Sequence, residues 1–348
     1  MRSVSEPWKD RVLRGSRDGF VETLVSNAAL LRRRIRDPRF SMELYGVGRR
    51  SRSDVAICYI SDSVDQSVLN RMRKLIQSID VDALTMNIES LAECMFTHKW
   101  INPFPKFKYS ERPDTATAAI LDGNIVIMVD NSPAVMIIPA SIFDIIEEAD
   151  DFNFSPMIGS YLRITRFFFS IVTWILTPLW LLFVNNPDWV PEFMKFVLIT
   201  DDITVPVLLQ LLILELAVDG LKLAAVNTPT MLSTPLSIVA GIVVGEYAVS
   251  SGWFNPEALL YMAVVTVGTY GQTNFEMGYA FKFLRVLTLI LTQVFNLGGF
   301  IAGVVISVLM IAFNRTITGK SYIYPLIPWD GKMLKRKVFR VRLPHSYK

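Results

Sequence analysis

Two carboxylates interrupt a long apolar stretch of the sequence. The run VPVLLQLLILELAVDGLKLAAV, from Val205 to Val226, contains Glu215 and Asp219, which are one helical turn apart. A charged side chain at the centre of a bilayer costs roughly 2.5–3.5 kcal/mol on insertion scales, so such residues usually face a polar cavity or a partner. Rings of carboxylates from several subunits favour cations in channels. These two side chains are therefore candidates for ion conduction.

The helical positions around this pair predict a pore-lining face. On an α-helix, Glu215, Asp219 and Lys222 share one side, and leucines continue that side toward Val205. The predicted pore-lining residues are Leu208, Leu211, Glu215, Asp219 and Lys222. The leucines would form an apolar constriction that closes by dewetting, and the acidic residues would tune selectivity.

The same residues allow a second interpretation. Asp219 and Lys222 are three positions apart and could pair near the membrane interface, where Lys222 would extend its ammonium group to water. Glu215 alone would then need a partner, such as a side chain on a neighbouring helix. A scaffold has no need for a polar stripe inside the membrane, whereas a water-filled pore does.

Catalytic and metal-binding motifs are missing from the sequence. Neither His98 nor His345 has the spacing of an HExxH site, and no GxSxG or GxGxxG occurs. The TGKS tetrapeptide resembles the end of a P-loop, but Asn314 stands where that motif needs a glycine. The adjacent Glu147 and Glu148 fit an exposed helix surface better than acid–base chemistry. We therefore expect no enzyme, no cofactor and no bound metal.

The elements that carry these residues divide the chain into contrasting parts. Of its 348 residues 51% are hydrophobic, and the mean hydropathy of +0.37 is high for a soluble protein. The sequence is charged and mixed before Ser160, and long apolar runs dominate after Phe167. This pattern predicts a cytoplasmic α/β domain over 1–160, a transmembrane helical domain over 161–316 and a basic cytoplasmic tail over 317–348.

The soluble part is predicted to stay in the cytoplasm. Cys58 and Cys94 are far apart and form no CxxC motif, so they are no disulfide framework and fit a reducing compartment. The first 17 residues have no apolar segment of the kind that a signal peptide needs. The net charge of +3 is small and gives no indication of a nucleic-acid partner.

The soluble domain is predicted to combine helices with a β-meander. The pattern indicates a basic-ended helix over 19–37, a buried strand over 54–61 and an amphipathic helix over 67–79. From Thr117 the sequence predicts three strands separated by turns at Asp122-Gly123 and Asp130-Asn131.

A charged segment precedes this meander. Pro113 biases Arg112 away from the helical conformation, so Glu111 and Arg112 are expected in an extended stretch. Arg112 is expected to make a bidentate contact to a carboxylate, within the domain or across a subunit interface.

The membrane domain is predicted to hold four or five hydrophobic segments. They cover residues 167–184, 205–226, 236–249, 258–271 and 286–313. Because basic clusters flank both the soluble domain and the tail, the positive-inside rule favours four true spans, with the short segment 258–271 re-entrant or interfacial. Gly241 and Gly245 form a GxxxG motif that permits close helix packing. The last segment is overlong and contains Gly298-Gly299.

Several stretches, taken in order, resemble one protein family. VLRGSRDGFVETLVSNAALLRRRIRDPR is similar to its opening signature, and SERPDTATAAILDGNIVIMVDNSPAVMIIPA to its ERPD segment. TPLSIVAGIVVGEYAVSSGWFNP and NFEMGYAFKFLRV fit in the same order. From about Val12 to Pro328 the chain resembles the A-subunit family of spore germinant receptors, the GerA family, and within it the SpoVAF branch.

The resemblance implies a multi-pass protein in the lipid of the spore inner membrane. Family members are thought to form homo-oligomers, with a pentamer implied, around an ion pore that other germination membrane proteins control. The SpoVAF branch is linked to release of dipicolinic acid. Members usually carry a further N-terminal α/β module, which we expect this chain to lack. The leading expectation is an ion channel subunit that releases ions from the spore core; the alternative is a non-conducting scaffold that assembles germination proteins.

Overall fold

The chain forms two compact units. The computed structural model describes residues 6–7, 10–96, 102–227 and 241–341. Unit 1 comprises Met1–Ile164 and Ile311–Lys348, and unit 2 comprises Thr165–Met310. The C-terminal residues therefore group with the N-terminal domain. His98, His345 and the first part of the expected segment 236–249 lie outside the described residues.

Unit 1 is built on a five-stranded antiparallel sheet with the strand order β1-β2-β4-β5-β3. The strands are β1 Phe40–Val47, β2 Ser53–Ile60, β3 Lys108–Ser110, β4 Ile125–Val129 and β5 Val135–Ile138. Every residue of the central strand β4 is buried, as expected for a strand that is covered on both faces.

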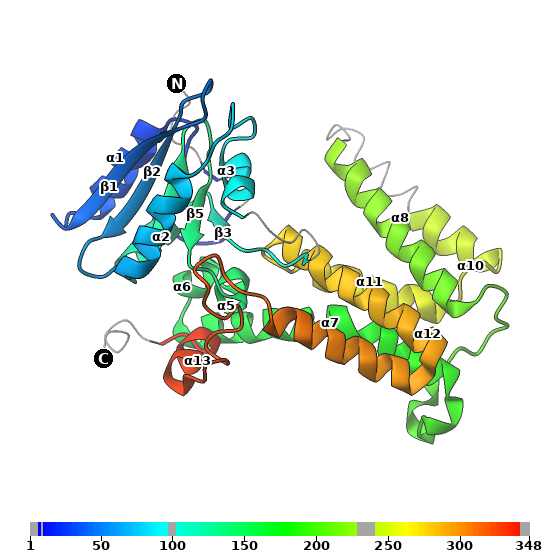
Figure 1. Cartoon of the computed structure of the whole chain (residues 1–348). Coiled ribbons are helices and arrows are strands. Elements are labelled where there is room, and N and C mark those ends of the chain that lie inside the picture. Colours follow the sequence, from blue (N-terminus) through cyan, green and yellow to red (C-terminus); the bar gives the residue numbers. More distant parts are fainter. Residues whose placement is uncertain (1–5, 8–9, 97–101, 228–240, 342–348) are drawn as a thin grey trace. The chain divides into compact units, whose positions relative to one another are not determined.

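Helices cover the two faces of this sheet (Figure 1). Alternate side chains of β2 and β4 point to opposite faces. On one face they pack against α1 Leu24–Arg34 and α4 Pro113–Leu121, and on the other against α2 Gln66–Gln77 and α3 Ile88–Met95. The predicted buried strand over 54–61 and the predicted helices over 19–37 and 67–79 are thus confirmed, although α1 starts five residues late.

The predicted β-meander is wrong in its first element. The stretch that begins at Thr117 belongs to α4, which starts with Pro113 in its first turn and buries Ala116 and Ile120, four positions apart. A short apolar run cannot be assigned to helix or strand by periodicity alone. The two later strands form as predicted, and Gly123 and Asn131 supply the positive φ angles of their turns.

Unit 2 is helical. Its elements are α7 Pro156–Asn185, whose first turns belong to unit 1, the 3₁₀ helices η1 Pro187–Trp189 and η2 Glu192–Val197, α8 Val207–Asn227, the π-helix η3 Gly241–Tyr247, α10 Ala248–Ser250, α11 Pro256–Tyr270 and α12 Phe275–Ala312. Within the described part of the chain, α7 and α12 are long and apolar enough to cross a membrane. The chain thus joins an α/β domain to a helical part with two candidate spans.

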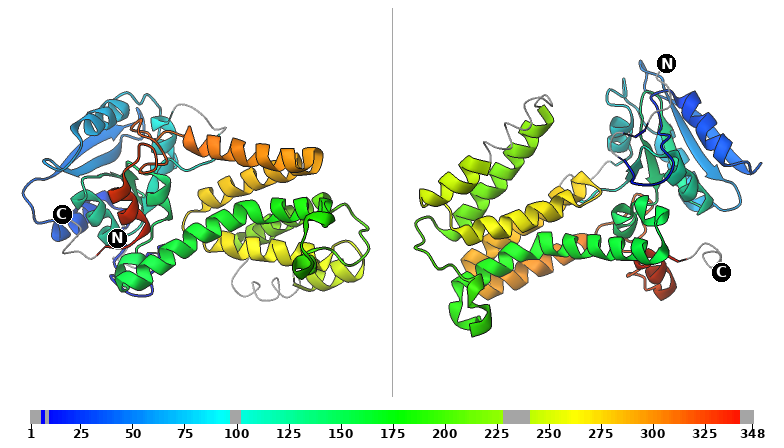
Figure 2. Two further views of the ribbon diagram at one scale, coloured as in Figure 1. Left: turned by 90° about the horizontal axis from the view of Figure 1, so that it is seen from below. Right: turned by 180° about the vertical axis from the view of Figure 1, so that it is seen from behind.

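The long α12 is a hairpin and not one straight helix. Asn296 has φ 50° and ψ −130°, which breaks the helix, and asparagine tolerates a positive φ better than most residues. Gly303 packs directly against Thr288, whereas fifteen residues of straight helix would separate the two by about 22 Å. The two arms therefore lie side by side (Figures 1 and 2). The expected single segment 286–313 is split by this reversal.

Two asparagines hold the tip of the hairpin. The side-chain amide of Asn296 donates to Asn186 at 2.9 Å, and the amide of Asn186 donates back at 2.6 Å. Asn186 directly follows the last residue of α7. The reversal of α12 is thereby fixed to the end of α7.

Candidate functional site

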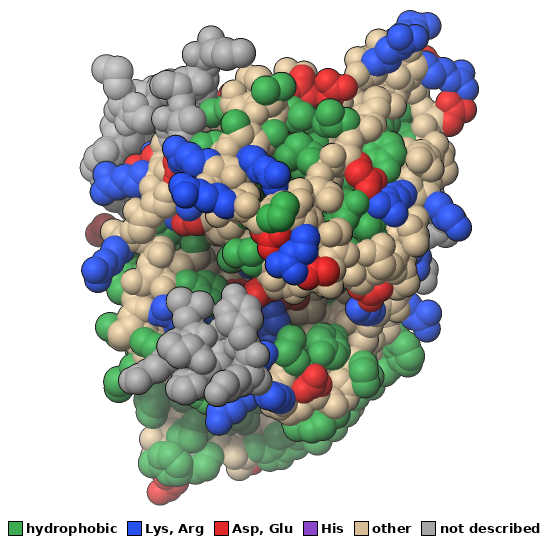
Figure 3. Space-filling view, turned by 90° about the vertical axis from the view of Figure 1, so that its left-hand side faces the viewer, with side chains coloured by type: hydrophobic (Ala, Val, Ile, Leu, Met, Phe, Trp, Pro, Cys, Tyr) green, Lys and Arg blue, Asp and Glu red, His purple; other side chains and the backbone are tan. Residues whose placement is uncertain are grey.

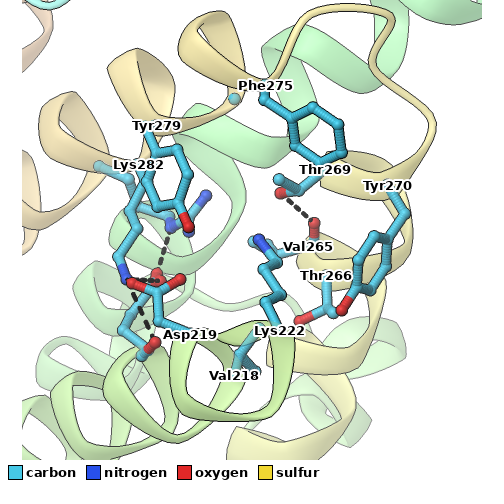
Figure 4. A pocket seen from close by; sticks show the side chains of 13 residues that line it. Val218, Asp219, Lys222, Val265, Thr266, Thr269, Tyr270, Phe275, Tyr279 and Lys282 are labelled. Atoms are coloured by element: carbon cyan, nitrogen blue, oxygen red, sulfur yellow. Dashed lines mark hydrogen bonds and ion pairs between the residues drawn. The ribbon is translucent and has the colours of Figure 1, made fainter. Parts of the chain in front are cut away.

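Five charged side chains gather between apolar helices of unit 2 (Figure 4). Glu215, Asp219 and Lys222 project from α8, and Lys282 and Arg285 project from the first arm of α12. They line a cavity of about 20 Å³, which has room for about one water molecule. The sequence predicted the three residues of α8, and the two of α12 were not predicted.

The most buried members are Glu215 and Arg285, which are 4% and 3% exposed. Arg285 Nε lies 2.5 Å from Oε1 of Glu215, and Arg285 Nη1 donates to the carbonyl oxygen of Thr173 on α7. A buried charge is costly unless it is paired and hydrogen-bonded. This one guanidinium group therefore ties α12 to both α8 and α7.

A second ion pair joins the same two helices. Lys282 Nζ is paired with Asp219, donates to the carbonyl oxygen of Glu215 at 3.2 Å and lies 3.7 Å from Oε2 of that residue. The alternative interpretation, in which Asp219 pairs with Lys222, is wrong because the partner of Asp219 is 63 positions away on α12. The structure thus supplies the neighbouring helix that Glu215 was expected to need.

Lys222 is the remaining cation of the cluster. Its Nζ lies 5.2 Å from the ring centroid of Tyr270 and 5.5 Å from that of Tyr279. No carboxylate of the described residues lies within ion-pair distance of it. Cation–π contacts contribute about 0.5–1 kcal/mol at exposed sites and about 2 when desolvated. The cluster therefore holds three cations against two carboxylates.

The helix α8 turns its charged face into unit 2. Leu211 is fully buried in a core with Trp180 of α7 and Met262 of α11, and Leu208 packs at its edge. The face of α8 that points away from this core is exposed among the described residues, and Leu216 on that face is 73% exposed. The exposed residues along this face of α8 are Leu209, Leu216, Gly220, Leu223 and Asn227. Three of the predicted pore-lining residues, Leu208, Leu211 and Glu215, are thus on the side of α8 that packs against other helices of unit 2. Asp219 and Lys222 are partly buried.

Close glycine packing occurs within the α12 hairpin, and close packing at Gly241 and Gly245 stays a prediction. A Cβ atom at Gly241 or Gly245 would meet no described atom within 4 Å. A Cβ at Gly299 would lie 1.8 Å from the carbonyl oxygen of Leu291, and one at Gly303 would lie 2.8 Å from Thr288. The spacing Gly299-xxx-Gly303 is itself a small-xxx-small motif, so the sequence did contain this signal.

Comparison with known proteins assigns the family. The model of the Bacillus/Clostridium GerA spore germination protein family matches residues 1–348. The chain belongs to this family. It is 38% identical over 343 residues to Stage V sporulation protein AF of Bacillus subtilis (strain 168). The aligned region covers 99% of this chain and 69% of that protein. It is 27% identical over 343 residues to Spore germination protein XA of Bacillus anthracis, covering 98% and 69%.

One solved structure is also similar to this GerA family member. It is the crystal structure of the N-terminal domain of the A subunit of the Bacillus megaterium spore germinant receptor GerK3. The match covers 34% of this chain and 93% of that chain at 32% identity, with a TM-score of 0.28, at which the likeness carries no argument about the fold.

The two family signatures in unit 1 contact each other. Arg112 is buried and donates through Nε and Nη2 to both oxygens of Asp114, at 3.0 and 2.5 Å. The same guanidinium group donates to the carbonyl oxygens of Asp10 and Ser16. The backbone N–H of Glu111 donates to the carboxylate of Asp10 at 2.9 Å. The ERPD segment therefore holds the opening stretch of the GerA signature in place.

Arg112→Lys should destabilise unit 1 by about 1.5–3 kcal/mol, because lysine keeps the charge but loses the planar fork that bonds Asp114 and two carbonyl groups. The matched control is Arg49→Lys. Arg49 makes the same bidentate contact to Asp80, at 2.8 and 2.6 Å, but both side chains are exposed to solvent. Charges of both signs are interspersed on the face of the protein that Figure 3 shows. Thermal unfolding of the two variants measures the difference, and equal melting temperatures would contradict a clamping role.

Proposed function

We propose that this chain is a membrane subunit of an ion-conducting homo-oligomer that acts in spore germination. The observation that carries the proposal is the charged cluster of Glu215, Asp219, Lys222, Lys282 and Arg285 between apolar helices. Ionisable residues at membrane depth are costly and usually mark ion paths or buried partners. The germination names of its relatives support the biological setting. The proposal also places the protein in the inner membrane of the spore, with four or five membrane spans and a pentameric assembly.

In this proposal α8 lies beside the conducting path. Asp219 and Lys222 line the small cavity and are only partly buried, so they are the cluster members closest to a path for ions. Leu211 and Glu215 are buried inside the protomer and hold α8 in place. The apolar constriction is then formed by the exposed face of α8, with Leu216 and neighbouring leucines from each subunit.

The arrangement of charges also bears on selectivity. Both carboxylates of the cluster are matched by Lys282 and Arg285. A ring of negative charge would therefore form only if Asp219 separates from Lys282. We propose that opening includes this separation, and that the paired arrangement is the closed state.

A non-conducting scaffold is the second candidate. The observation that favours it is that Glu215 and Asp219 both have partners within the same chain, which a purely structural network requires. A scaffold would assemble germination proteins at the membrane without moving ions.

The two candidates differ in one measurement. The purified chain is reconstituted in liposomes, and ion efflux is recorded together with the oligomeric mass. We expect Leu216→Ala to increase efflux several-fold, because it widens an apolar constriction. The control is Leu260→Ala, which truncates an exposed leucine of α11 in the same unit. A folded oligomer without efflux in the native chain and in both variants would favour the scaffold and remove the channel.

A further inference from the structure

The C-terminal helix α13, Gly331–Val338, and the residues just outside its two ends carry exposed basic and aromatic side chains, which form a stripe. Trp329, Lys332, Lys335 and Phe339 are all exposed, and Trp329 is 71% exposed. Lys332 and Lys335 are three positions apart in α13 and lie on one side of it. Trp329 comes just before the N-cap residue Asp330, and Phe339 is the C-cap residue, so an exposed aromatic ring lies beyond each end of the helix and two ammonium groups lie between them.

The opposite side of α13 is fastened to unit 1. Lys337 Nζ is paired with Asp144 and lies 3.7 Å from Glu147. Burial alone would lower the pKa of Lys337, but these two carboxylates outweigh it and raise that pKa. Arg163 Nη1 donates to the carbonyl oxygens of Arg336 and Lys337 at 3.1 and 2.9 Å. The orientation of α13 is fixed, so the stripe faces away from unit 1.

Arg163 places this helix close to an apolar segment. Its buried guanidinium group also bonds Glu147 at 3.1 Å and Asp151 at 3.3 Å. Arg163 belongs to α7, four residues before Phe167, where the long apolar run of that helix begins. Four residues of α-helix rise by about 6 Å. If α7 crosses a bilayer, α13 is therefore bonded within about one turn of the bilayer surface.

The charge of the segment around α13 indicates which kind of surface the stripe would bind. Residues 315–341 contain seven Lys or Arg residues and one acidic residue, Asp330. Exposed tryptophan and phenylalanine rings favour the interfacial region of a bilayer, and each lysine near an anionic surface contributes about fivefold to binding. A basic amphipathic helix with aromatic residues is typical of segments that lie in the membrane interface.

We propose that the stripe of Trp329, Lys332, Lys335 and Phe339 binds the headgroups of anionic phospholipids. The helix then rests on the same bilayer that α7 enters, and Arg163 links the two. This inference depends on α7 crossing the membrane and is independent of ion conduction.

The test uses the whole chain with Cys94 replaced by serine. Cys58 stays, because it is fully buried and its burial raises the pKa of its thiol, so it does not react. A fluorophore on Ile327→Cys, an exposed position two residues before Trp329, reports access of the neutral quencher acrylamide. We expect several-fold weaker quenching in nanodiscs that contain phosphatidylglycerol than in discs of phosphatidylcholine alone. Lys332→Glu with Lys335→Glu should weaken the bound state at least about 30-fold and restore quenching.

Two controls isolate the stripe. The pair Arg50→Glu and Lys74→Glu changes the net charge of unit 1 by the same amount at exposed positions elsewhere, and it should leave quenching in anionic discs low. A fluorophore on Leu44→Cys in β1 should be insensitive to lipid charge. Equal quenching in both lipids would overturn the proposal. Protection that persists in detergent would also overturn it, because it would indicate a second copy or another protein on the stripe.

Discussion

Arg285→Gln should destabilise the helical unit by about 3–5 kcal/mol. The substitution removes the nearer of the two cations beside the buried carboxylate of Glu215 and leaves Lys282, 3.7 Å from Oε2, as its charged neighbour. Removing one partner of a buried ion pair is the costly way to break it. It also removes the hydrogen bond to the carbonyl group of Thr173, so residue 285 no longer bonds both α8 and α7, and Lys282 supplies the remaining ion pair between α12 and α8. Thermal unfolding of the purified chain in detergent measures the loss, and a reduced yield of monodisperse protein should accompany it.

The control for this prediction is Lys195→Gln. That change breaks the exposed ion pair of Lys195 and Glu192, whose N···O distance is 3.4 Å. It should lower the free energy of unfolding by less than about 1 kcal/mol. The double variant Arg285→Gln with Glu215→Gln should recover part of the stability, because two neutral amides can bond each other. A single variant that unfolds at the temperature of the native chain would mean that the pair does not hold α8.

Gly299→Ala should break the packing of the α12 hairpin, whereas Gly298→Ala, one residue earlier, should not. A Cβ at Gly299 would lie 1.8 Å from the carbonyl oxygen of Leu291, so the two arms would have to separate. A Cβ at Gly298 would meet no described atom within 4 Å. Alanine is favoured over glycine in helices by about 1 kcal/mol, so Gly298→Ala should be neutral or slightly stabilising. For Gly299→Ala we expect a loss of several kcal/mol, comparable with overpacking or strain in a core.

Melting temperatures of these two neighbouring variants give a direct comparison, because both add one methyl group to the same segment. Equal stability of the two alanine variants would show that α12 is straight at this point.

Local patterns in the sequence predicted much of unit 1. The buried strand over 54–61 and the helix over 67–79 have strong periodicity and turn residues at their ends, and both form. The error at Thr117 arose because a short run of alanine, threonine and isoleucine suits either a helix or a strand. Pro113 at the first helical position was the signal that favoured α4.

The partners in the candidate site could not be predicted in the same way. Glu215 and Arg285 are 70 positions apart, and only the packing of α8 against α12 brings them together. The sequence did place Lys282 and Arg285 three residues apart in an apolar stretch, and two cations there should have indicated carboxylate partners. Which face of α8 meets them was ambiguous, because α8 is apolar on nearly every side.

A hairpin changes how membrane crossings are counted. Two arms joined at one tip begin and end on the same side of any layer they enter, so α12 contributes two crossings or none. The stretch 286–313 would count once in a hydropathy profile, yet the reversal at Asn296 returns the chain to the side from which Phe275 entered. The parity of crossings, and with it the side reached by the C-terminal residues, is therefore decided before Phe275. Any topology drawn for this chain has to put Phe275 and Ala312 on the same face.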